Sequence, residues 1–311
     1  MIIPLQFEFR PYARSFRQPL QTHHGQWCVR NGVIIRLTNS LGETRYGEIA
    51  PINWFGSETI TEAIAFCQSL PVEIDANTIA QIPDALPACQ FGFESALNAV
   101  QSINRVAQCA LLPTGAAACS AWESLCYQGF QTFKLKIGVN AIQEELTTLK
   151  TLVAQLPDDV RLRLDANAGL TPTETRRWLE ICDDLNIEFL EQPLSIDQFE
   201  TMLELSYRYK TPIALDESVS TLNQLKNCYD RGWRGIFVIK PAIIGFPSRL
   251  RRFCQQHSID TVFSSVFETA IARRVGLQLS AEFSDRAAGY GTLHWFDTLK
   301  SDDFETLWHS L

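Results

Sequence analysis

The sequence lacks the features of several classes of protein. It has no run of about 18 apolar residues, the length that a transmembrane helix needs, and no basic stretch followed by an apolar one at its start. Its nine cysteines contain no Cys-x-x-Cys pair, which argues against a disulfide framework or a zinc site and favours reduced, mostly buried thiols. A net charge of −8 argues against nucleic acid or an anionic membrane as a partner. We therefore expect a cytoplasmic protein without membrane insertion and make no prediction of its oligomeric state.

The composition that remains is typical of a globular chain. Of its 311 residues, 46% are hydrophobic and 20% are charged, which is enough for a large core and two domains. The first 50 residues alternate apolar and polar positions, as antiparallel strands do, and helical patterns follow at 57–66 and 89–100. The polar stretch 15–30 predicts a long mobile loop. Residues 1–105 are therefore predicted to form an α+β domain.

Strands and helices alternate from residue 106 onward. Eight short apolar segments have strand character, and they lie at 110–117, 131–137, 160–165, 187–191, 212–216, 235–240, 259–264 and 286–290. This alternation predicts an α/β fold with a parallel (β/α)8 barrel over 106–292. An open doubly wound sheet is the alternative, but no Gly-x-Gly-x-x-Gly fingerprint follows any strand. The tail, 293–311, is too short for a domain, and we expect it to pack on the N-terminal domain.

Five successive strands of the predicted barrel end in ionisable residues. In chain order they deliver Lys134 with Lys136, Asp165 with Asn167, Glu191, Asp216 with Glu217, and Lys240. Successive side chains of a strand point to opposite faces, so Lys134 and Lys136 share one face. Active sites of such barrels lie at the C-terminal ends of the strands. We therefore expect all these side chains to converge at one mouth.

Three carboxylates at one mouth would repel one another unless a cation lay among them. Oxygen ligands without histidine or cysteine predict Mg²⁺, with Mn²⁺ able to substitute. The alternative is that the acids cap the helices that follow, which is a common role for aspartate. Capping suits Glu191 less well, because it stands directly before Gln-Pro. For the lysines, the alternative is a solvated barrel rim.

These strand ends resemble those of the enolase superfamily and, within it, of the muconate-lactonizing subgroup. The resemblance rests on Lys-x-Lys at strand 2, Asp-Ala-Asn at strand 3, Glu-Gln-Pro at strand 4, Asp-Glu-Ser at strand 5 and Ile-Lys-Pro at strand 6. It covers nearly the whole chain and implies a (β/α)8-type, modified TIM barrel with an N-terminal α+β capping domain. It also implies that Asp165, Glu191 and Asp216 hold Mg²⁺. Lys136 would be the base, and Lys240 would support the intermediate with positive charge from the opposite wall.

The same resemblance implies roles for residues around this centre. Asn167 and Glu217 would hydrogen-bond the metal ligands, as groups around metal sites usually do. Ser264 and Ser265 end strand 7, where hydroxyls could meet a substrate carboxylate, and capping of the next helix is the alternative. Gly289 at strand 8 would let the backbone approach the substrate.

Three further motifs and the short chain indicate one branch of the subgroup. Tyr46-Gly-Glu-Ile-Ala-Pro, Gln90-Phe-Gly-Phe-Glu-Ser-Ala-Leu and Phe263-Ser-Ser-Val-Phe-Glu-Thr-Ala-Ile resemble the branch that forms 2-succinylbenzoate in menaquinone or phylloquinone synthesis. This implies a lyase whose small-molecule substrate, 2-succinyl-6-hydroxy-2,4-cyclohexadiene-1-carboxylate, loses water through an enediolate that Mg²⁺ stabilises. Lys136 would take the α-proton and then assist loss of the hydroxyl from the same face. Lys134 would keep the proton affinity of its neighbour low.

Other functions remain open on the sequence. A dipeptide epimerase shares the lysines and the metal site but typically carries Asp-x-Asp at strand 8, where 287–294 offers no acid. N-Acylamino acid racemisation uses the same lysine pair. A catalytically silent barrel that acts as a binding protein is the non-enzymatic alternative. Thermal melting with and without Mg²⁺ separates that last case from an enzyme, because a ligand that binds the native state stabilises it.

Overall fold

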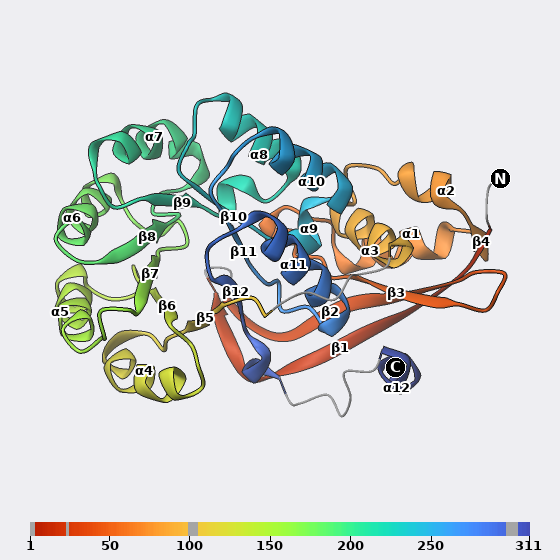
Figure 1. Cartoon of the computed structure of the whole chain (residues 1–311), viewed down its shortest axis with the longest axis horizontal. Coiled ribbons are helices and arrows are strands. Elements are labelled where there is room, and N and C mark those ends of the chain that lie inside the picture. Colours follow the sequence, from red (N-terminus) through yellow and green to blue (C-terminus); the bar gives the residue numbers. More distant parts are fainter. Residues whose placement is uncertain (1–3, 23–24, 99–104, 297–303) are drawn as a thin grey trace.

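The computed structural model describes residues 4–22, 25–98, 105–296 and 304–311. It contains an antiparallel four-stranded sheet and a parallel eight-stranded barrel, which lie beside each other in Figure 1. The predicted fold class is therefore confirmed: a (β/α)8-type barrel carries an N-terminal α+β capping domain. No helix in the described ranges is long and apolar enough to cross a bilayer. All nine cysteines are unpaired and six are buried, as the sequence predicted.

The capping domain is a small sheet with helices packed on it. Its strands have the order β3-β2-β1-β4, and their bounds are β1 Leu5–Thr22, β2 Gly25–Thr38, β3 Thr44–Ile49 and β4 Glu73–Ile74. Its helices are α1 Ile60–Ser69, α2 Ala76–Ala80 and α3 Pro87–Leu97. Helix α1 begins at a capping box, in which Thr59 and Glu62 satisfy each other's backbone N–H groups.

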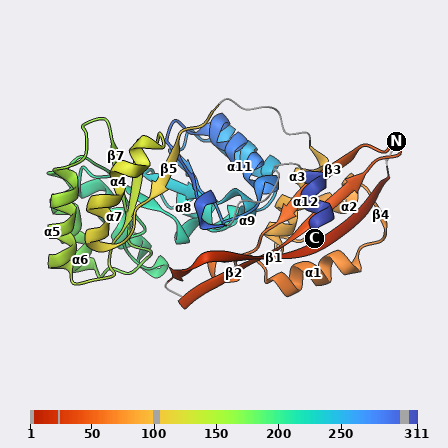
Figure 2. The same cartoon turned by 90° about the horizontal axis from the view of Figure 1, so that it is seen from below.

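The predicted mobile loop at 15–30 is wrong. Strands β1 and β2 form one long hairpin through this stretch, and Figure 2 shows it extending from the capping domain to beneath the barrel. The register shifts between Ser15 and Leu20, so that residues 16–19 bulge out of the ladder. Most of its polar side chains face solvent or the cavity, while its backbone is paired on either side of the bulge. Polarity alone therefore did not distinguish a strand from a loop.

Two glycines hold helix α3 against strand β3. A Cβ atom on Gly47 would lie 2.0 Å from the carbonyl oxygen of Gly92, and one on Gly92 would lie 2.8 Å from the carbonyl oxygen of Glu48. No real Cβ contact is that short, so both positions require glycine for this close backbone approach. Ten of the eleven residues of α3 are buried in consequence.

The barrel strands follow the order β11-β10-β9-β8-β7-β6-β5-β12. Their bounds are β5 Gln108–Leu111, β6 Thr132–Lys136, β7 Arg161–Asp165, β8 Ile187–Glu191, β9 Ile213–Leu215, β10 Ile236–Ile239, β11 Thr261–Phe263 and β12 Ala288–Gly291. A bridge between Ser264 and Gly289 joins the two outer strands and closes the ring. The first strand starts and ends before the predicted 110–117, because Pro113 and the turn at Gly115 lie inside that range.

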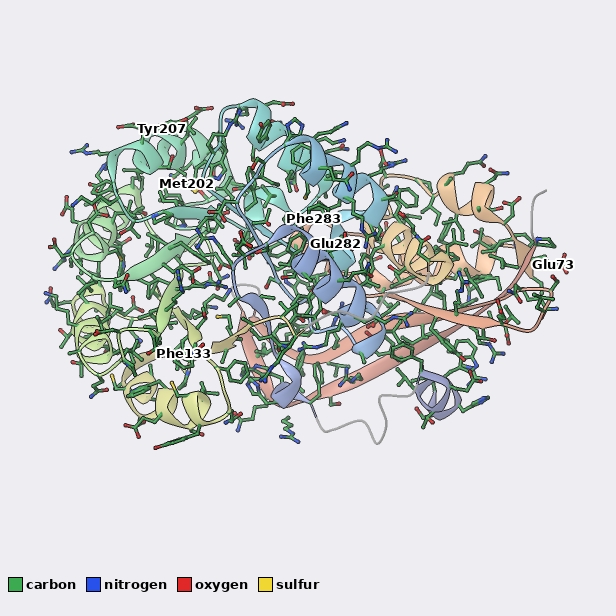
Figure 3. All side chains as sticks on the ribbon, viewed as in Figure 1. Glu73, Phe133, Met202, Tyr207, Glu282 and Phe283 are labelled. Atoms are coloured by element: carbon green, nitrogen blue, oxygen red, sulfur yellow. The ribbon has the colours of Figure 1, made fainter. Side chains whose placement is uncertain are left out.

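Helices cover the outside of the barrel. Their bounds are α4 Ala118–Tyr127, α5 Ile142–Val153, α6 Pro172–Cys182, α7 Phe199–Arg208, α8 Leu222–Asp230, α9 Pro241–Ile244, α10 Pro247–Gln256 and α11 Ala270–Phe283. Each long helix turns an apolar stripe inward. Figure 3 shows this on α7, where the buried Met202 points toward the barrel and the exposed Tyr207 points away from it.

Buried hydrogen bonds and ring contacts join the capping domain to other parts of the chain. The buried carboxylate of Glu48 accepts hydrogen bonds from the backbone N–H groups of Thr269 (2.9 Å) and Ala272 (3.1 Å) at the start of α11. The last helix, α12 (Phe304–Ser310), lies on the capping sheet, where Arg10 donates to the carbonyl oxygen of Trp308 at 2.5 Å. The Arg10 guanidinium also stacks 4.4 Å from the centre of the indole ring.

Candidate active site

One cavity of about 860 Å³ opens between the mouth of the barrel and the capping domain. All eleven site residues predicted from the sequence line it: Lys134, Lys136, Asp165, Asn167, Glu191, Asp216, Glu217, Lys240, Ser264, Ser265 and Gly289. The capping domain contributes part of the bulge and an aromatic group around Trp27 and Phe55. The C-terminal ends of the strands therefore meet at one covered site.

The register of the barrel explains this convergence. Lys136 pairs with Asp165 on the neighbouring strand, and Asp165 pairs with Glu191 on the next. Side chains at the same level of adjacent parallel strands point the same way. The three groups therefore face the barrel axis at one height, and Lys134 lies one step below Lys136 on the same face.

Lys134 is the central cation of the acidic cluster. Its Nζ atom lies 2.7 Å from Oδ2 of Asp165 and 2.9 Å from Oε1 of Glu191. Burial disfavours the charged form of Lys134, but these two carboxylates outweigh it and raise its pKa well above the usual range. Lys134 is therefore held as an ammonium and is excluded as a general base in this arrangement.

Lys240 lies on the opposite wall of the barrel, four strands away from Lys134. Its ammonium is paired with Oδ1 of Asp216 and lies 3.9 Å from the centre of the Phe55 ring. The aromatic face and the carboxylate both favour positive charge at this point. Lys240 therefore presents a fixed cation to the cavity.

Lys136 differs from both of these lysines. It lines the cavity and is partly exposed, and no described residue hydrogen-bonds or pairs with its ammonium group. A lysine that is not committed to a carboxylate can exchange a proton with a ligand in the cavity. Among the three lysines, Lys136 is the one that the geometry leaves available for proton transfer.

Burial and mutual repulsion change the acidity of the carboxylates. Burial, with Asp165 nearby, raises the pKa of Glu191 to about 8, and burial raises the pKa of Asp216 to about 6. Burial also acts to raise the pKa of Asp165, but the Lys134 ammonium outweighs it and keeps that pKa below its usual range. The cluster holds more negative charge than its neighbourhood neutralises, and an added cation would relieve that excess.

Asn167 and Glu217 lie behind the ligand candidates. The Asn167 side chain donates to Oε1 of Glu217 at 3.3 Å, and its backbone N–H donates to Oδ1 of Asp165 at 3.1 Å. The other oxygen of Glu217, Oε2, is buried without a hydrogen-bond partner in the described structure. An orphaned carboxylate oxygen of this kind indicates a missing cation or donor.

The arrangement fits a hard divalent cation such as Mg²⁺. The buried donors are carboxylate oxygens, without imidazole or thiolate, which is the set that Mg²⁺ prefers. Among the described residues, the carboxylates of this site pair with lysine ammonium groups, and no three of them lie close enough together to hold a metal ion as they stand. The alternative of helix capping is wrong for Asp216, whose side chain makes no capping hydrogen bond.

The end of strand β11 shows which serine is free to meet a ligand. The Ser265 hydroxyl accepts from the backbone N–H of Phe267 at 2.9 Å and donates to Glu268 at 2.9 Å, so it is engaged within the loop before α11. The N-cap of α11 is Thr269, so the capping alternative is wrong for both serines. No hydrogen bond of the Ser264 hydroxyl occurs within the described residues, and its Oγ would lie 2.7 Å from a Cβ on Gly289. A side chain at position 289 would therefore collide with Ser264, which faces the cavity, so glycine fits this position.

Two features in and around the cavity were not predicted. The bulge at residues 16–19 places Arg17 and Gln18 on the lining, although their stretch was expected to be a loop. Gln192, directly after β8, has a φ of 33°, in the left-handed region that a residue other than glycine rarely adopts. The Glu-Gln-Pro motif restricts the backbone of this residue, because proline follows it, but it does not indicate a left-handed φ.

The chain is similar to known proteins in both sequence and structure. Residues 117–308 match the family model described as "Enolase C-terminal domain-like". The chain is 39% identical to an o-succinylbenzoate synthase of Thermosynechococcus vestitus, over 99% of both proteins. It superposes on the crystal structure of an o-succinylbenzoate synthase from Thermosynechococcus elongatus BP-1 with a TM-score of 0.93. The two chains are 38% identical, the match covers 99% of this chain and 100% of that one, and that structure is complexed with magnesium in its active site. The L-Ala-D/L-Glu epimerase of Bacillus subtilis shares the fold, with a TM-score of 0.81 and 20% identity over 97% of this chain and 92% of that one.

Proposed function

The chain belongs to the o-succinylbenzoate synthases of the enolase superfamily, and on this basis we propose that it dehydrates 2-succinyl-6-hydroxy-2,4-cyclohexadiene-1-carboxylate to 2-succinylbenzoate with Mg²⁺. It would act as a carbon–oxygen lyase of menaquinone or phylloquinone synthesis. The observation that carries the proposal is the uncommitted Lys136 beside a buried acidic cluster, with Lys240 fixed on the opposite wall. Base, metal ligands and counter-charge are then all present in one covered cavity.

Asp165, Glu191 and Asp216 would hold the magnesium ion. Their burial and the orphaned oxygen of Glu217 behind them support this assignment. When bound, Mg²⁺ supplies Lewis-acid stabilisation of the negative charge that develops on the substrate carboxylate during proton removal. The carboxylate oxygens of Asp165 and Asp216 already form ion pairs with the ammonium groups of Lys134 and Lys240, so they are placed to bind a cation.

Lys136 would carry out both proton transfers. Its neutral amine takes the proton from the ring carbon that bears the carboxylate, and the resulting ammonium gives a proton to the ring hydroxyl, which leaves as water. One C–H and one C–O bond break, and the ring becomes aromatic. Both events occur on one face because one side chain serves both, which gives a syn elimination.

Lys240, Ser264 and the capping domain would position the substrate and shield it from water. Lys240, held by Asp216 and Phe55, places positive charge opposite Lys136. Ser264 would meet the succinyl carboxylate at the end of β11. The cap over the cavity limits water, so charges inside it interact more strongly than in solvent.

We propose that residues 1–105 and the tail 293–311 act together as the cap, and that 106–292 form the catalytic barrel. Support comes from the contact of Arg10 with Trp308, which ties α12 to the capping sheet. The capping residues on the cavity lining support a role for this domain in substrate binding.

An epimerase of the same subgroup is the less favoured function. Every carboxylate on the described lining comes from the ends of β7, β8 and β9, and β12 contributes Gly289 without an acid. A dipeptide ammonium group would therefore find no carboxylate at that strand. N-Acylamino acid racemisation needs only the lysines and the metal and stands as a side activity to be measured in parallel.

The test is an assay of the purified protein on the cyclohexadiene substrate, with Mg²⁺ and with excess EDTA. We expect 2-succinylbenzoate to form only with the metal, and Glu191→Ala to be inactive and unable to bind Mg²⁺ while its circular dichroism spectrum stays that of the wild type. Formation of product under EDTA would overturn the metal assignment. Racemisation of an N-succinylamino acid without dehydration would overturn the proposed reaction.

A further inference from the structure

Gln192 occupies an unusual place at the mouth of the barrel. It is fully buried, and it follows the proposed metal ligand Glu191 with a backbone φ of 33°. Strain of this kind persists only where the surroundings impose it, and it is concentrated at functional sites. Proline follows at position 193 and further restricts this backbone.

The main chain of Gln192 joins the segments of all three proposed ligands. Its N–H donates to the carbonyl oxygen of Ala214 at 2.8 Å, two residues before Asp216. Its carbonyl oxygen accepts from the N–H of Ala168 at 2.7 Å, three residues after Asp165. The strand ends of β7, β8 and β9 are therefore linked through one residue.

The side-chain amide adds a second set of links. Oε1 accepts from the backbone N–H groups of Asp216 (2.9 Å) and Ser218 (3.2 Å). Nε2 donates to the Ser218 hydroxyl at 2.8 Å and to the carbonyl oxygen of Leu194 at 2.9 Å. The amide thus fixes the backbone from which the Asp216 carboxylate projects, and every polar atom of the side chain is used.

We propose that Gln192 is a positioning residue that sets the distance between the Glu191 and Asp216 carboxylates and so determines the affinity of the site for Mg²⁺. The inference rests on the proposed function, because it takes these carboxylates as the ligands. Gln192 does not line the cavity, so it would act through the backbone of its neighbours. Residues that orient metal ligands typically contribute about ten- to a hundredfold to metal affinity.

Gln192→Met is the direct test, because methionine keeps the unbranched shape and removes every side-chain hydrogen bond of Gln192, including that of Nε2 to Sδ of Met202 at 3.7 Å. Gln90→Met is its matched control: Gln90 is also buried and donates to Ile82 and Asp84, both at 2.9 Å, but lies in α3 of the capping domain. Isothermal titration with Mg²⁺ alone gives the dissociation constants of both variants and the wild type, and thermal melting gives their stabilities.

We expect the Mg²⁺ dissociation constant to rise by about ten- to a hundredfold in Gln192→Met and to stay within about twofold of the wild type in Gln90→Met, although both lose stability. Should Gln192→Met not fold, Ser218→Ala removes one partner of the amide and is expected to weaken Mg²⁺ binding by a smaller factor. Unchanged Mg²⁺ affinity in whichever of these two variants folds would overturn the inference. Failure of the wild type to bind Mg²⁺ would instead overturn the proposed function.

Discussion

At the scale of single residues, the site is a set of buried charges whose partners decide their roles. Lys134 and Lys240 are held by carboxylates, whereas no described residue pairs with Lys136. The sequence predicted that these side chains would converge, because strand ends and side-chain alternation can be read from residue order. It did not predict which lysine would be committed to a carboxylate. That depends on distances across the barrel, which have no local signature.

A second charge cluster is centred on the buried Glu188 and joins β7 and β8 to the segment before β12. Glu188 lies 2.7 Å from Arg163 and 2.7 Å from Arg286. Burial acts to raise the pKa of Glu188, but the two guanidinium groups outweigh it and hold the pKa below its usual range. The stabilisation is therefore complete above the ordinary pKa of a glutamate, about 4.3, and is lost as the pH falls through the lower value of the folded state.

We predict that Glu188→Gln lowers the free energy of unfolding by about 3 kcal/mol at pH 7, because the buried guanidinium of Arg163 loses its charged partner, whereas the partly exposed Arg286 keeps Asp260. The difference from the wild type should shrink below about pH 4, where the glutamate is protonated in the unfolded chain. Urea unfolding over a pH series measures it. Glu200→Gln, which breaks the exposed pair with Arg231, is the control and should cost less than about 1 kcal/mol. An equal loss at pH 3 and pH 7 would refute the electrostatic explanation.

At the scale of elements, the barrel strands followed from the sequence and the first hairpin did not. Short apolar segments between helical patterns identify parallel strands, because both faces of such strands are buried. Strand β1 instead changes environment along its length, with the core on one side near Phe7 and solvent or the cavity further on. Its polar second half therefore has the composition of a loop, and only pairing with β2 makes it a strand.

The bulge in this hairpin leads to a second prediction. Deleting Arg17 and Gln18 shortens the bulge by two residues, so the flanking side chains stay on the same faces of the sheet. KM should rise at least about tenfold, a loss of roughly 1.4 kcal/mol of binding. The melting temperature should change by less than about 4 °C, because the ladder on either side remains. Deletion of Ser40 and Leu41 at the other hairpin turn, outside the cavity lining, should leave KM unchanged. An unchanged KM in the first deletion would remove the bulge from the substrate site.

At the scale of the whole molecule, the two domains are joined by buried carboxylates that cap helices. Glu48 of the capping sheet accepts from two N–H groups in the first turn of α11 and from the Tyr12 hydroxyl at 2.6 Å. Glu94 of α3 accepts from the backbone N–H of Ser248 in α10 at 3.1 Å. The motifs around these glutamates indicated the family, and the structure gives their physical reason.

We predict that Glu48→Ala costs at least about 3 kcal/mol of unfolding free energy, because it leaves several buried donors without an acceptor. Glu62→Ala, which removes an exposed capping carboxylate from α1, is the control and should cost much less. Chemical denaturation of both variants measures the two values. Equal losses would show that Glu48 caps a helix but does not hold the domains together.

We propose that Lys136 removes the proton and assists the departure of water. The decisive measurement is the rate of dehydration by Lys136→Arg, with Mg²⁺ and product binding measured by calorimetry on the same preparation. A guanidinium keeps its positive charge at every accessible pH and cannot serve as a base. We predict that Lys136→Arg binds Mg²⁺ and 2-succinylbenzoate but turns over at least about 10³-fold more slowly than the wild type, as loss of general acid–base catalysis requires. Dehydration within about tenfold of the wild-type rate would contradict the account and assign the base to another residue.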